Sequence, residues 1–454
     1  MIVLKFGGTS VRNAEWIDKA IDITVMQIER APVLVASAMG DTTDDLLAAA
    51  EGAAAGNRAA AKDTLAAARR HHLATARAFL TGANLERCQD TVEGYFRELG
   101  SMVTGLALLR EITPRSRDLI LSFGERLSTL LIAHRAWERG LDAELLDTRE
   151  FVKTDDSFGH ALPIEEVTNR LVLEKVRPAK GRIIIAQGFI ASTLEGITST
   201  LGRGGSDYTA TILGAALGAD EVQIWTDVTG VMTADPRVFK NATTIPRITY
   251  QEAAELAYFG AKVIHPSTAQ PAVARSIPVW VRNTGDPSAA GTCIVAELAS
   301  EGPKAVASKQ NITLVSVSSG RMLLAYGFLT RIFEIFERYQ TSVDLIATSE
   351  VTVSVTIDDD HALQQITREL EALGTVQIER ARSIICLVGQ NLWKDSVIIA
   401  RVFACLKETP IRLISLGSSD TNLSIVVPQD RTEEAVGRLH REFFEPEAVK
   451  ASNS

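Results

Sequence analysis

The sequence predicts an α/β protein in which a mainly parallel sheet is sandwiched by helices and is followed by two α+β units of ferredoxin-like topology. Two observations predict it. Apolar strands alternate with helical segments over about the first 290 residues, as in proteins with parallel sheets. The last third instead repeats a β-α-β-β-α pattern with a period of about 70 residues, as split β-α-β units do.

Strands and helical segments alternate over about the first 290 residues. Apolar runs predict strands at 2–6, 32–38, 142–148, 182–191 and 221–228. Helical spacing predicts helical segments at 14–30, 44–112, 122–140 and 206–219. The helix at 122–140 ends at Gly140, as helices often end at glycine. Strands connected by helices are expected to run parallel, with helices on both faces of the sheet.

The C-terminal repeat has two copies. The first copy predicts strands at 312–319, 343–350, 351–358 and 375–381, with helices at 327–340 and 361–373. The second copy predicts strands at 383–390, 411–418 and 421–428, with helices at 396–409 and 432–444.

The second copy lacks its final strand, and an unpaired strand edge is a liability for a folded protein. We therefore expect residues 303–309, just before the first copy, to complete the second one, so that the two units are interleaved. A Gly-, Pro- and Ser-rich join at 283–304 marks the boundary with the first part. The expected domains are 1–297, 310–383 and 384–454, the last of them completed by the strand from 303–309.

The composition excludes several classes of protein. The formal net charge of −9 argues against nucleic acid or an acidic membrane as the main partner. The four cysteines form no CxxC pair, so neither a zinc site nor a disulfide framework is indicated, and reduced thiols in the cytoplasm are expected. The N-terminus has no signal-peptide pattern, and no apolar run approaches the ~20 residues that span a bilayer.

Two glycine-rich segments carry polar groups next to expected strands and helices. KFGGTS, which begins at Lys5, places a cation and two glycines at the end of a buried strand. TLGRGGSDYTA places Arg203, Ser206 and Asp207 directly before or within the start of a helix. Backbone N–H groups at a helix start, approached closely through glycine, form an anion site. Ser206 or Asp207 could equally be a helix N-cap.

Two further segments are less specific. WTDVTGVMTADPR places Asp227 and Asp235 after a strand, where ligands bind in open α/β sheets, but a polar turn is an equally good explanation. FGAKVIHPST contains Lys262, and a single lysine on a helix is usually solvated. None of these segments matches the P-loop or the Rossmann pattern. Together they place glycines and cations at several strand ends, which suits a phosphorylated ligand.

Seven segments in order resemble the motifs of aspartate kinases, members of the amino acid kinase family. They are KFGGTS, SAMGDTTDDLL, SFGERLS, QGFI, TLGRGGSD, WTDVTGVMTADPR and FGAKVIHP. The C-terminal units resemble ACT domains, the regulatory modules of that family, so the resemblance covers nearly the whole chain. It implies the amino acid kinase fold and transfer of the γ-phosphoryl group of ATP to the β-carboxylate of L-aspartate. The product, 4-phospho-L-aspartate, begins lysine, threonine and methionine biosynthesis.

The residue types agree with this chemistry. The β-carboxylate has a reference pKa of ~3.9, so it is ionised near neutrality and needs no general base. Negative charge builds on the transferring phosphoryl group and on the leaving oxygen, so cations and backbone N–H groups are required. Lys5, Gly7 and Gly8 would supply them. Mg²⁺ is expected with ATP, held mainly by phosphates and water, so no dedicated metal ligands are expected in the sequence.

The resemblance also implies roles for individual residues. Lys5 and Asp207 would be catalytic, with Asp207 holding Lys5 in place. Arg203 would pair with a substrate carboxylate, and Glu125 would take the substrate ammonium, unless Glu125 is a carboxylate favoured by a helix N-terminus. The residues expected to bind aspartate are Thr43, Glu125, Arg203 and Ser206. Those expected to bind ATP are Lys5, Phe6, Gly7, Gly8, Thr226, Asp227, Met232, Arg237, Lys262 and Val263; at Met232 family members often carry Tyr.

The regulatory part resembles the lysine-sensitive type of aspartate kinase, through SVDLIATSEV and the segment upstream of it. The resemblance implies feedback inhibition by L-lysine, with L-threonine as the alternative effector. From the pattern alone, a strand–turn–strand with a solvated Glu350 is the simpler explanation. ACT units expose sheet edges that pair with another subunit, so a homodimer or a larger homo-oligomer is expected. The expected effector residues are Met322, Val343, Asp344, Thr348, Ser349 and Glu350.

Three other functions fit the sequence less well. A kinase of the same family that acts on glutamate, acetylglutamate or a nucleotide would not need SAMGDTTDDLL and SFGERLS together, nor the ACT pair. A non-catalytic amino-acid sensor predicts loss of Lys5 or Asp207, and both are present. A fused dehydrogenase is not expected in this chain.

Overall fold

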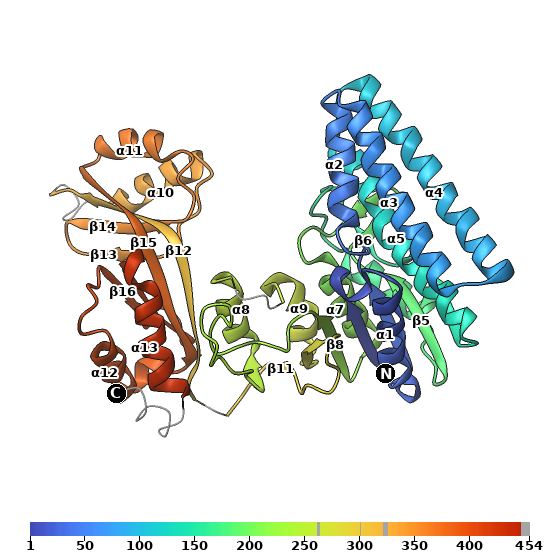
Figure 1. Cartoon of the computed structure of the whole chain (residues 1–454). Helices are drawn as coiled ribbons and strands as arrows, with labels where there is room; N and C mark the ends of the chain where they lie inside the picture. Colours follow the sequence, from blue (N-terminus) through green and yellow to red (C-terminus); the bar gives the residue numbers. More distant parts are fainter. Residues whose placement is uncertain (261–263, 300, 321–325, 446–454) are drawn as a thin grey trace. The chain divides into compact units, whose positions relative to one another are not determined.

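The computed structural model describes residues 1–260, 264–299, 301–320 and 326–445. They form two compact units, each discontinuous in sequence. The first unit comprises residues 1–231, 246–250 and 264–297. The second comprises residues 232–245, the described residues from 251 to 260, and those from 298 onward. Figure 1 colours both units along the chain.

The first unit is built on an eight-stranded sheet with the strand order β3-β5-β2-β1-β8-β10-β11-β9. From β3 to β10 the neighbouring strands are parallel, as the strand–helix alternation predicts, and β11 is antiparallel to β10. In chain order the strands are β1 Ile2–Phe6, β2 Pro32–Ala36, β3 Asp142–Leu146, β5 Arg182–Gln187, β8 Glu221–Thr226, β9 Arg247–Thr249, β10 Val279–Asn283 and β11 Thr292–Val295.

Helices flank this sheet (Figure 1). The predicted helix at 14–30 is shorter than expected and is followed by a short 3-10 helix at Ile28–Arg30, while the region 44–112 consists of three helices. The helices of the first unit are α1 Ala14–Val25, α2 Thr42–Ala54, α3 Arg58–Phe79, α4 Gly82–Leu109, α5 Pro114–Glu138, α6 Glu165–Lys175, α7 Gly205–Leu217 and α9 Pro266–Ala274. Helix α8, Tyr250–Tyr258, belongs to the second unit from its second residue onward. No helix among the described residues is long and apolar enough to span a bilayer.

Strand β1 shows how the sheet divides its side chains between two faces. Ile2, Leu4 and Phe6 are fully buried and belong to the large core that also contains residues of α1 to α5. Side chains alternate along a strand, so Val3 and Lys5 lie on the opposite face. Helix α7 packs on that face, because a Cβ added to its Gly214 would lie 4.0 Å from Val3 and 2.6 Å from Val222.

A second sheet of three short strands was not predicted. Its order is β4-β6-β7, formed by Lys153–Thr154, Ile190–Thr193 and Thr198–Thr200. Its strands are two to four residues long, too short for a periodic pattern to be recognisable. Strand β7 leads directly into the glycine-rich segment before α7, so this sheet positions one side of the site described below.

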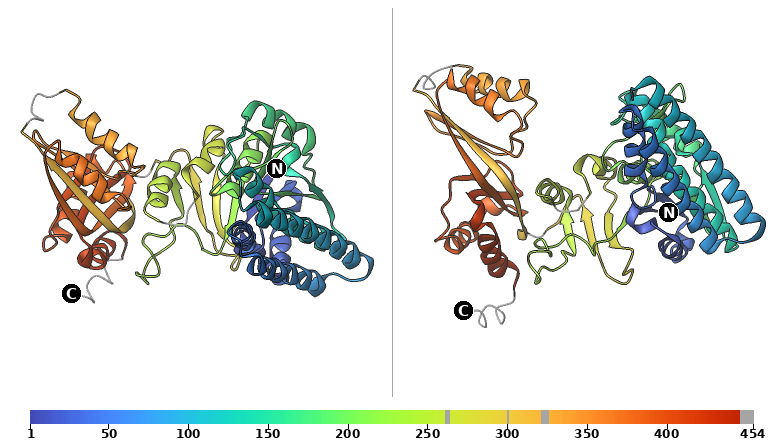
Figure 2. Two further views of the ribbon diagram at one scale, coloured as in Figure 1. Left: turned by 90° about the horizontal axis from the view of Figure 1, so that it is seen from above. Right: turned by 45° about the horizontal axis from the view of Figure 1, so that its top comes forward.

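The second unit contains a six-stranded sheet with the order β13-β14-β12-β15-β17-β16. Figure 2 shows its two long strands, β12 Gly302–Ser318 and β15 Thr375–Gln390, side by side. The other strands and the helices are β13 Ile346–Thr348, β14 Thr352–Ile357, β16 Leu413–Leu416, β17 Asn422–Pro428, α10 Phe328–Arg338, α11 Leu363–Glu371, α12 Ser396–Cys405 and α13 Thr432–Phe444. This is the β-α-β-β-α repeat that the sequence predicts.

The long strands serve both copies of the repeat. The second half of β12 pairs with β14 and with the first half of β15, over the core formed with α10 and α11. Its first half, Gly302 to Lys309, pairs instead with the last residues of β15, over the core formed with α12 and α13. The strand before the first copy thus completes the second copy, which is the pairing that an interleaved arrangement requires.

Candidate active site

An ion pair lies at the carboxyl end of β1. The Nζ atom of Lys5 is 2.6 Å from Oδ1 of Asp207, and the two side chains are only 11% and 18% exposed. Lys5 meets Asp207 because it lies on the face of the sheet that α7 covers. Helix α7 begins at Gly205, and its N-cap is Gly204, at φ 72°. The alternative that Ser206 or Asp207 caps this helix is therefore wrong.

The glycines after β1 allow close backbone contacts. A Cβ added to Gly8 would lie 2.9 Å from the carbonyl oxygen of Gly40 and 3.0 Å from that of Ala38, so only glycine fits there. Gly8 also opens a 3-10 helix, whose first N–H groups have no acceptor within the helix. The Gly7 N–H, in contrast, already donates to the Trp225 carbonyl at 3.1 Å. Of the two glycines, Gly8 is thus better placed to offer its amide to a phosphate.

Glu125 lies in the middle of α5, so the alternative of a carboxylate at a helix N-terminus is wrong. Its helix packs against the loop after β2, since a Cβ added to Gly124 would lie 2.8 Å from Ala38 Cβ and 3.4 Å from Thr43 Oγ1. Oε1 of Glu125 accepts the Ala38 N–H at 3.2 Å, whereas Oε2 is buried without a hydrogen-bond partner among the described residues. Burial raises the pKa of Glu125 to about 8, although Ala38 and the charge of Lys5 oppose the rise.

The start of α7 is packed against the end of β5. A Cβ added to Gly188 would lie 2.5 Å from Ser206 Cβ, and one added to Gly205 would lie 2.7 Å from the ring of Phe189. Ser206 is therefore buried, while Arg203 is exposed in the turn before the helix. The structure thus gathers the predicted residues of the first unit at the carboxyl ends of β1, β2 and β5, where open α/β sheets bind ligands.

Asp118, on α5, was not recognised from the sequence. Its carboxylate is fully buried and accepts the N–H groups of Gly159 and Thr200 at 2.9 and 2.8 Å and the Thr200 hydroxyl at 2.9 Å. Burial raises the pKa of Asp118, and these three hydrogen bonds oppose the rise. Thr200 is the last residue of β7, so Asp118 anchors the loop that carries Arg203 to the start of α7.

The residues predicted to bind the nucleotide divide between the two units. Phe6 is fully buried and stacks on Trp225, so a ligand would meet only its backbone. Thr226 ends β8, and its hydroxyl donates to exposed Asp227 at 3.1 Å. Met232 and Arg237 belong to the second unit, and Lys262 and Val263 lie outside the described residues. The Arg237 side chain is 81% exposed and is held by Asp235 at 2.7 Å.

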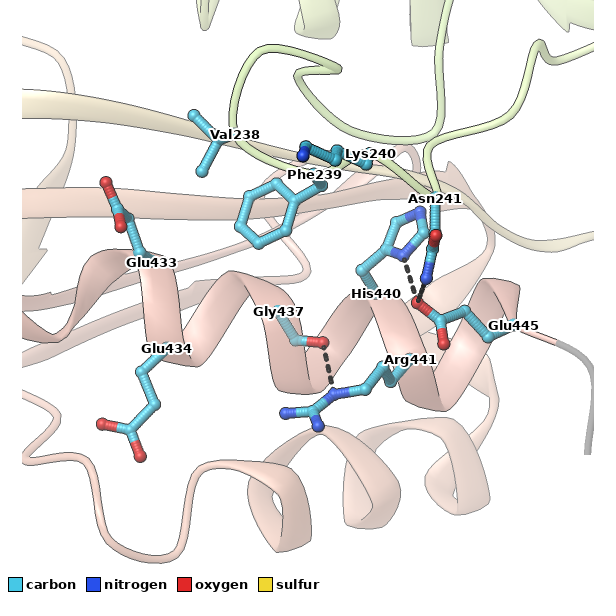
Figure 3. Close-up of a pocket in the computed structure, with 10 residues that line it drawn as sticks. All are labelled: Val238, Phe239, Lys240, Asn241, Glu433, Glu434, Gly437, His440, Arg441 and Glu445. Atoms are coloured by element: carbon cyan, nitrogen blue, oxygen red, sulfur yellow. Dashed lines mark hydrogen bonds and ion pairs between the residues drawn. The ribbon is translucent and has the colours of Figure 1, made fainter. Parts of the chain in front are cut away.

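The segment 232–245, which carries Met232 and Arg237, packs on α13 within the second unit. The Thr233 hydroxyl is 2.9 Å from Nε2 of buried His440, and the ring of Phe239 stacks on that imidazole at 6.3 Å. Figure 3 shows Phe239 and His440 among the side chains that line a cavity of about 300 Å³. Its lining mixes charges of both signs: Val238, Phe239, Lys240, Asn241, Glu433, Glu434, Gly437, His440, Arg441 and Glu445.

The residues predicted for the effector surround the start of β13. The Asp344 side chain is only 2% exposed, and Val343 is half-buried. Thr348, Ser349 and Glu350 are exposed where β13 turns into β14, which is the simple strand–turn–strand that the pattern alone indicated. Met322 lies outside the described residues.

The potential metal ligands and the thiols of the described residues bear on two further kinds of site, metal centres and reactive cysteines. Within the described ranges, no cluster of three or more His, Cys, Asp or Glu side chains could hold a metal ion. The four cysteines are free thiols, and burial raises the pKa of Cys88 and of Cys386 to about 12, so neither is a thiolate near neutrality.

Comparison with known proteins agrees with this geometry. The model of the amino acid kinase family matches residues 1–283, and a model of the ACT domain matches residues 385–443. The chain is 38% identical to lysine-sensitive aspartokinase 3 of Escherichia coli, over 98% of this chain and 99% of that protein. It is also 38% identical to the chloroplastic aspartokinase 1 of Arabidopsis thaliana, over 98% of this chain and 80% of that protein.

Solved structures agree with the sequence comparison. Escherichia coli aspartokinase III in complex with lysine and aspartate, in the T-state, has a TM-score of 0.83 at 38% identity, covering 98% of this chain and 100% of that one. The same enzyme in complex with aspartate and ADP, in the R-state, has a TM-score of 0.82. The chain belongs to the amino acid kinase family. Within that family it is one of the aspartokinases, and it is therefore a kinase with C-terminal ACT domains.

Proposed function

We propose that the chain transfers the γ-phosphoryl group of ATP to the β-carboxylate of L-aspartate, giving 4-phospho-L-aspartate, as the first step of lysine, threonine and methionine biosynthesis. The observation that carries this proposal is the ion pair of Lys5 and Asp207 at the end of β1, next to buried Glu125. A fixed cation thus lies close to a carboxyl group whose Oε2 has no hydrogen-bond partner among the described residues.

The proposed chemistry is charge neutralisation rather than proton transfer. An aspartate carboxylate is ionised near neutrality and attacks directly, so the protein must offset the charge of two approaching anions. Lys5 stabilises the transferring phosphoryl group, and Asp207 keeps the Lys5 ammonium in position. The amide of Gly8 faces the phosphates. Mg²⁺ accompanies ATP and is held mainly by phosphate oxygens and water.

The amino-acid substrate is held at both ends. Glu125 Oε2 receives the ammonium, which supplies the partner that this buried atom lacks among the described residues. Arg203 pairs with a carboxylate through its planar guanidinium. Thr43 and Ser206 complete the aspartate site. On the nucleotide side we propose backbone contacts from Phe6 and Gly7 and side-chain contacts from Thr226, Asp227, Met232, Arg237, Lys262 and Val263.

Regulation and assembly complete the proposal. L-Lysine inhibits the enzyme by binding the ACT units at Met322, Val343, Asp344, Thr348, Ser349 and Glu350, in line with the lysine-sensitive relative. The domain limits are 1–297, 310–383 and 384–454, with a strand from 303–309. The chain forms a homodimer or larger homo-oligomer through ACT units, whose edge strands β13 and β16 expose Ile346 and Ile414. The four free thiols suit a reducing cytoplasm.

The experiment incubates the purified protein with Mg²⁺, ATP and L-aspartate and traps the acyl phosphate with hydroxylamine. Hydroxamate should form only when aspartate is present and should be absent with Lys5→Met. Lysine and threonine are added in parallel, and suppression by lysine alone supports the effector assignment. If the folded protein binds nucleotide yet forms no hydroxamate, the acceptor is not aspartate and the proposal is wrong.

A further inference from the structure

A charged cluster in the second unit surrounds Asp344. Nζ of Lys309 is 3.1 Å from Oδ1 of Asp344 and 2.7 Å from Oδ2 of Asp358. The Tyr258 hydroxyl donates to the same Oδ1 of Asp344, and the Lys309 ammonium lies 4.5 Å from the centre of the Tyr258 ring. The four side chains come from β12, the residues before β13, the residue after β14, and the end of α8.

This cluster has one more negative charge than positive charges. Two carboxylates face a single ammonium, and the Tyr258 hydroxyl adds a hydrogen bond but no charge. The Asp344 side chain is 2% exposed, and its Oδ2 is buried without a hydrogen-bond partner among the described residues. Its backbone is fixed as well, because the Asp344 N–H donates to the Thr356 carbonyl at 2.9 Å. A buried carboxylate oxygen with no partner is unfavourable, so the cluster favours one further cation.

We infer that Lys309, Asp358 and Tyr258 determine the affinity of the effector site for an amino acid whose ammonium group is received at Oδ2 of Asp344. This inference rests on the proposed effector role of Asp344. With the ligand bound, the cluster holds two ammonium groups and two carboxylates and is neutral. Lys309 opposes the arriving ammonium because the two charges are alike. Asp358 weakens that repulsion, because it also binds the Lys309 ammonium and draws it away from Asp344.

Lys309 is well placed for this role. It is the last residue of the first half of β12. The register of β12 against β15 shifts directly after it, between Lys309 and Ile312. The pair of Lys309 with Asp344 therefore ties the strand shared by both ACT units to the residues that precede β13. The Lys309 side chain remains 21% exposed, so it has room to move toward Asp358, whose side chain is 40% exposed.

The test measures lysine inhibition of the full-length enzyme in variants whose charges change in opposite directions. Lys309→Met should lower the lysine concentration for half-inhibition by about threefold to tenfold, because the like charge is gone. Asp358→Asn should raise that concentration by a similar factor, because Lys309 then pairs with Asp344 alone and repels the ligand ammonium more strongly. Lys309→Arg keeps the charge and should stay within about twofold of the wild type. The matched control is Lys407→Met, at an exposed lysine of the same unit.

A second measurement does not depend on inhibition. The shift of the unfolding temperature with added lysine reports binding to the folded protein directly. Lys309→Met should show a larger shift than the wild type, since the bound lysine then pairs with Asp344 without repulsion from the Lys309 ammonium. Tyr258→Phe should change the shift less than Lys309→Met, because it removes a hydrogen bond and no charge.

The outcomes separate this inference from the proposed regulation. If lysine inhibits the wild type and the two variants move in opposite directions, both are supported. If lysine inhibits the wild type and Lys309→Met and Asp358→Asn leave the half-inhibiting concentration unchanged, the regulation stands and the inference is overturned. If the wild type neither responds to lysine nor binds it, the regulation is wrong, and the inference that rests on it is wrong as well.

Discussion

Glu125→Gln should stabilise the substrate-free protein at alkaline pH while abolishing tight aspartate binding. The Glu125 carboxyl has a pKa of about 8 in the folded protein against an ordinary value of 4.5, because it is buried and Oε2 has no partner among the described residues. Between these two values the folded protein binds this proton and the unfolded chain does not. Stability therefore falls as the pH rises from 4.5 to 8, and the full penalty is present above pH 8. Glutamine is neutral throughout and removes the penalty.

The size of the effect follows from the same numbers. Each pKa unit corresponds to about 1.4 kcal/mol, so the rise of this pKa from 4.5 to about 8 lowers the free energy of unfolding above pH 8 by about 5 kcal/mol. The glutamine amide keeps the Ala38 hydrogen bond through its oxygen, but its N–H groups lack an acceptor, at a cost of about 1–3 kcal/mol. The net stabilisation above pH 8 is then about 2–4 kcal/mol, or about 4–8 °C in the unfolding temperature.

The assay is thermal unfolding of both proteins from pH 5.5 to 9 without ligands. The difference in unfolding temperature should be near zero at pH 5.5 and should grow steadily up to pH 8. Aspartate binding should also release about one proton at pH 7 from the wild type, because the substrate ammonium favours ionised Glu125, and none from the variant. Calorimetry in buffers of different ionisation enthalpy measures that proton. A temperature difference that is the same at every pH would refute the reasoning.

Three further predictions concern the same site. Lys5→Met should lower kcat by about 10²–10³ or more while changing the aspartate KM far less, since Lys5 acts on the transferring group; a raised KM with an unchanged kcat would instead show that Lys5 acts in ground-state binding. Gly8→Ala should destabilise the protein by about 1–3 kcal/mol in denaturant titrations, because its Cβ would lie 2.9 Å from a carbonyl oxygen. Asp118→Ala should destabilise it by about 1–3 kcal/mol and raise the aspartate KM, because the N–H groups of Gly159 and Thr200 and the Thr200 hydroxyl lose their acceptor; a variant of unchanged stability would contradict this.

The sequence predicts the parts of the fold that rest on local periodicity. The apolar runs at 2–6, 32–38 and 221–228 coincide with central parallel strands, and the two β-α-β-β-α copies are visible from their alternation. The sheet β4-β6-β7 was missed because its strands are short and polar. The helix at 14–30 was predicted too long, because the chain leaves the α-helix after Val25 although the apolar pattern continues.

The candidate site was predictable where motifs are contiguous and hidden where contacts are distant. Lys5 and Asp207 lie in recognisable glycine-rich segments, although their pairing depends on which face of β1 meets α7. Asp118 carries no local signal, because its role is defined by Gly159 and Thr200, 41 and 82 residues away. The pairing of Lys309 with Asp344 likewise spans 35 residues and needs the folded β12 to bring them together.

The continuous strands β12 and β15 limit how this regulatory half can be divided. Each strand runs through both ACT units, so neither unit forms a closed module with its own complete set of strands. A cut between them anywhere in the chain would leave one sheet without an edge strand, and the two units should unfold together in one cooperative transition. A single ACT unit therefore could not be exchanged between related enzymes by recombination or by protein engineering. The two units would have to be exchanged together.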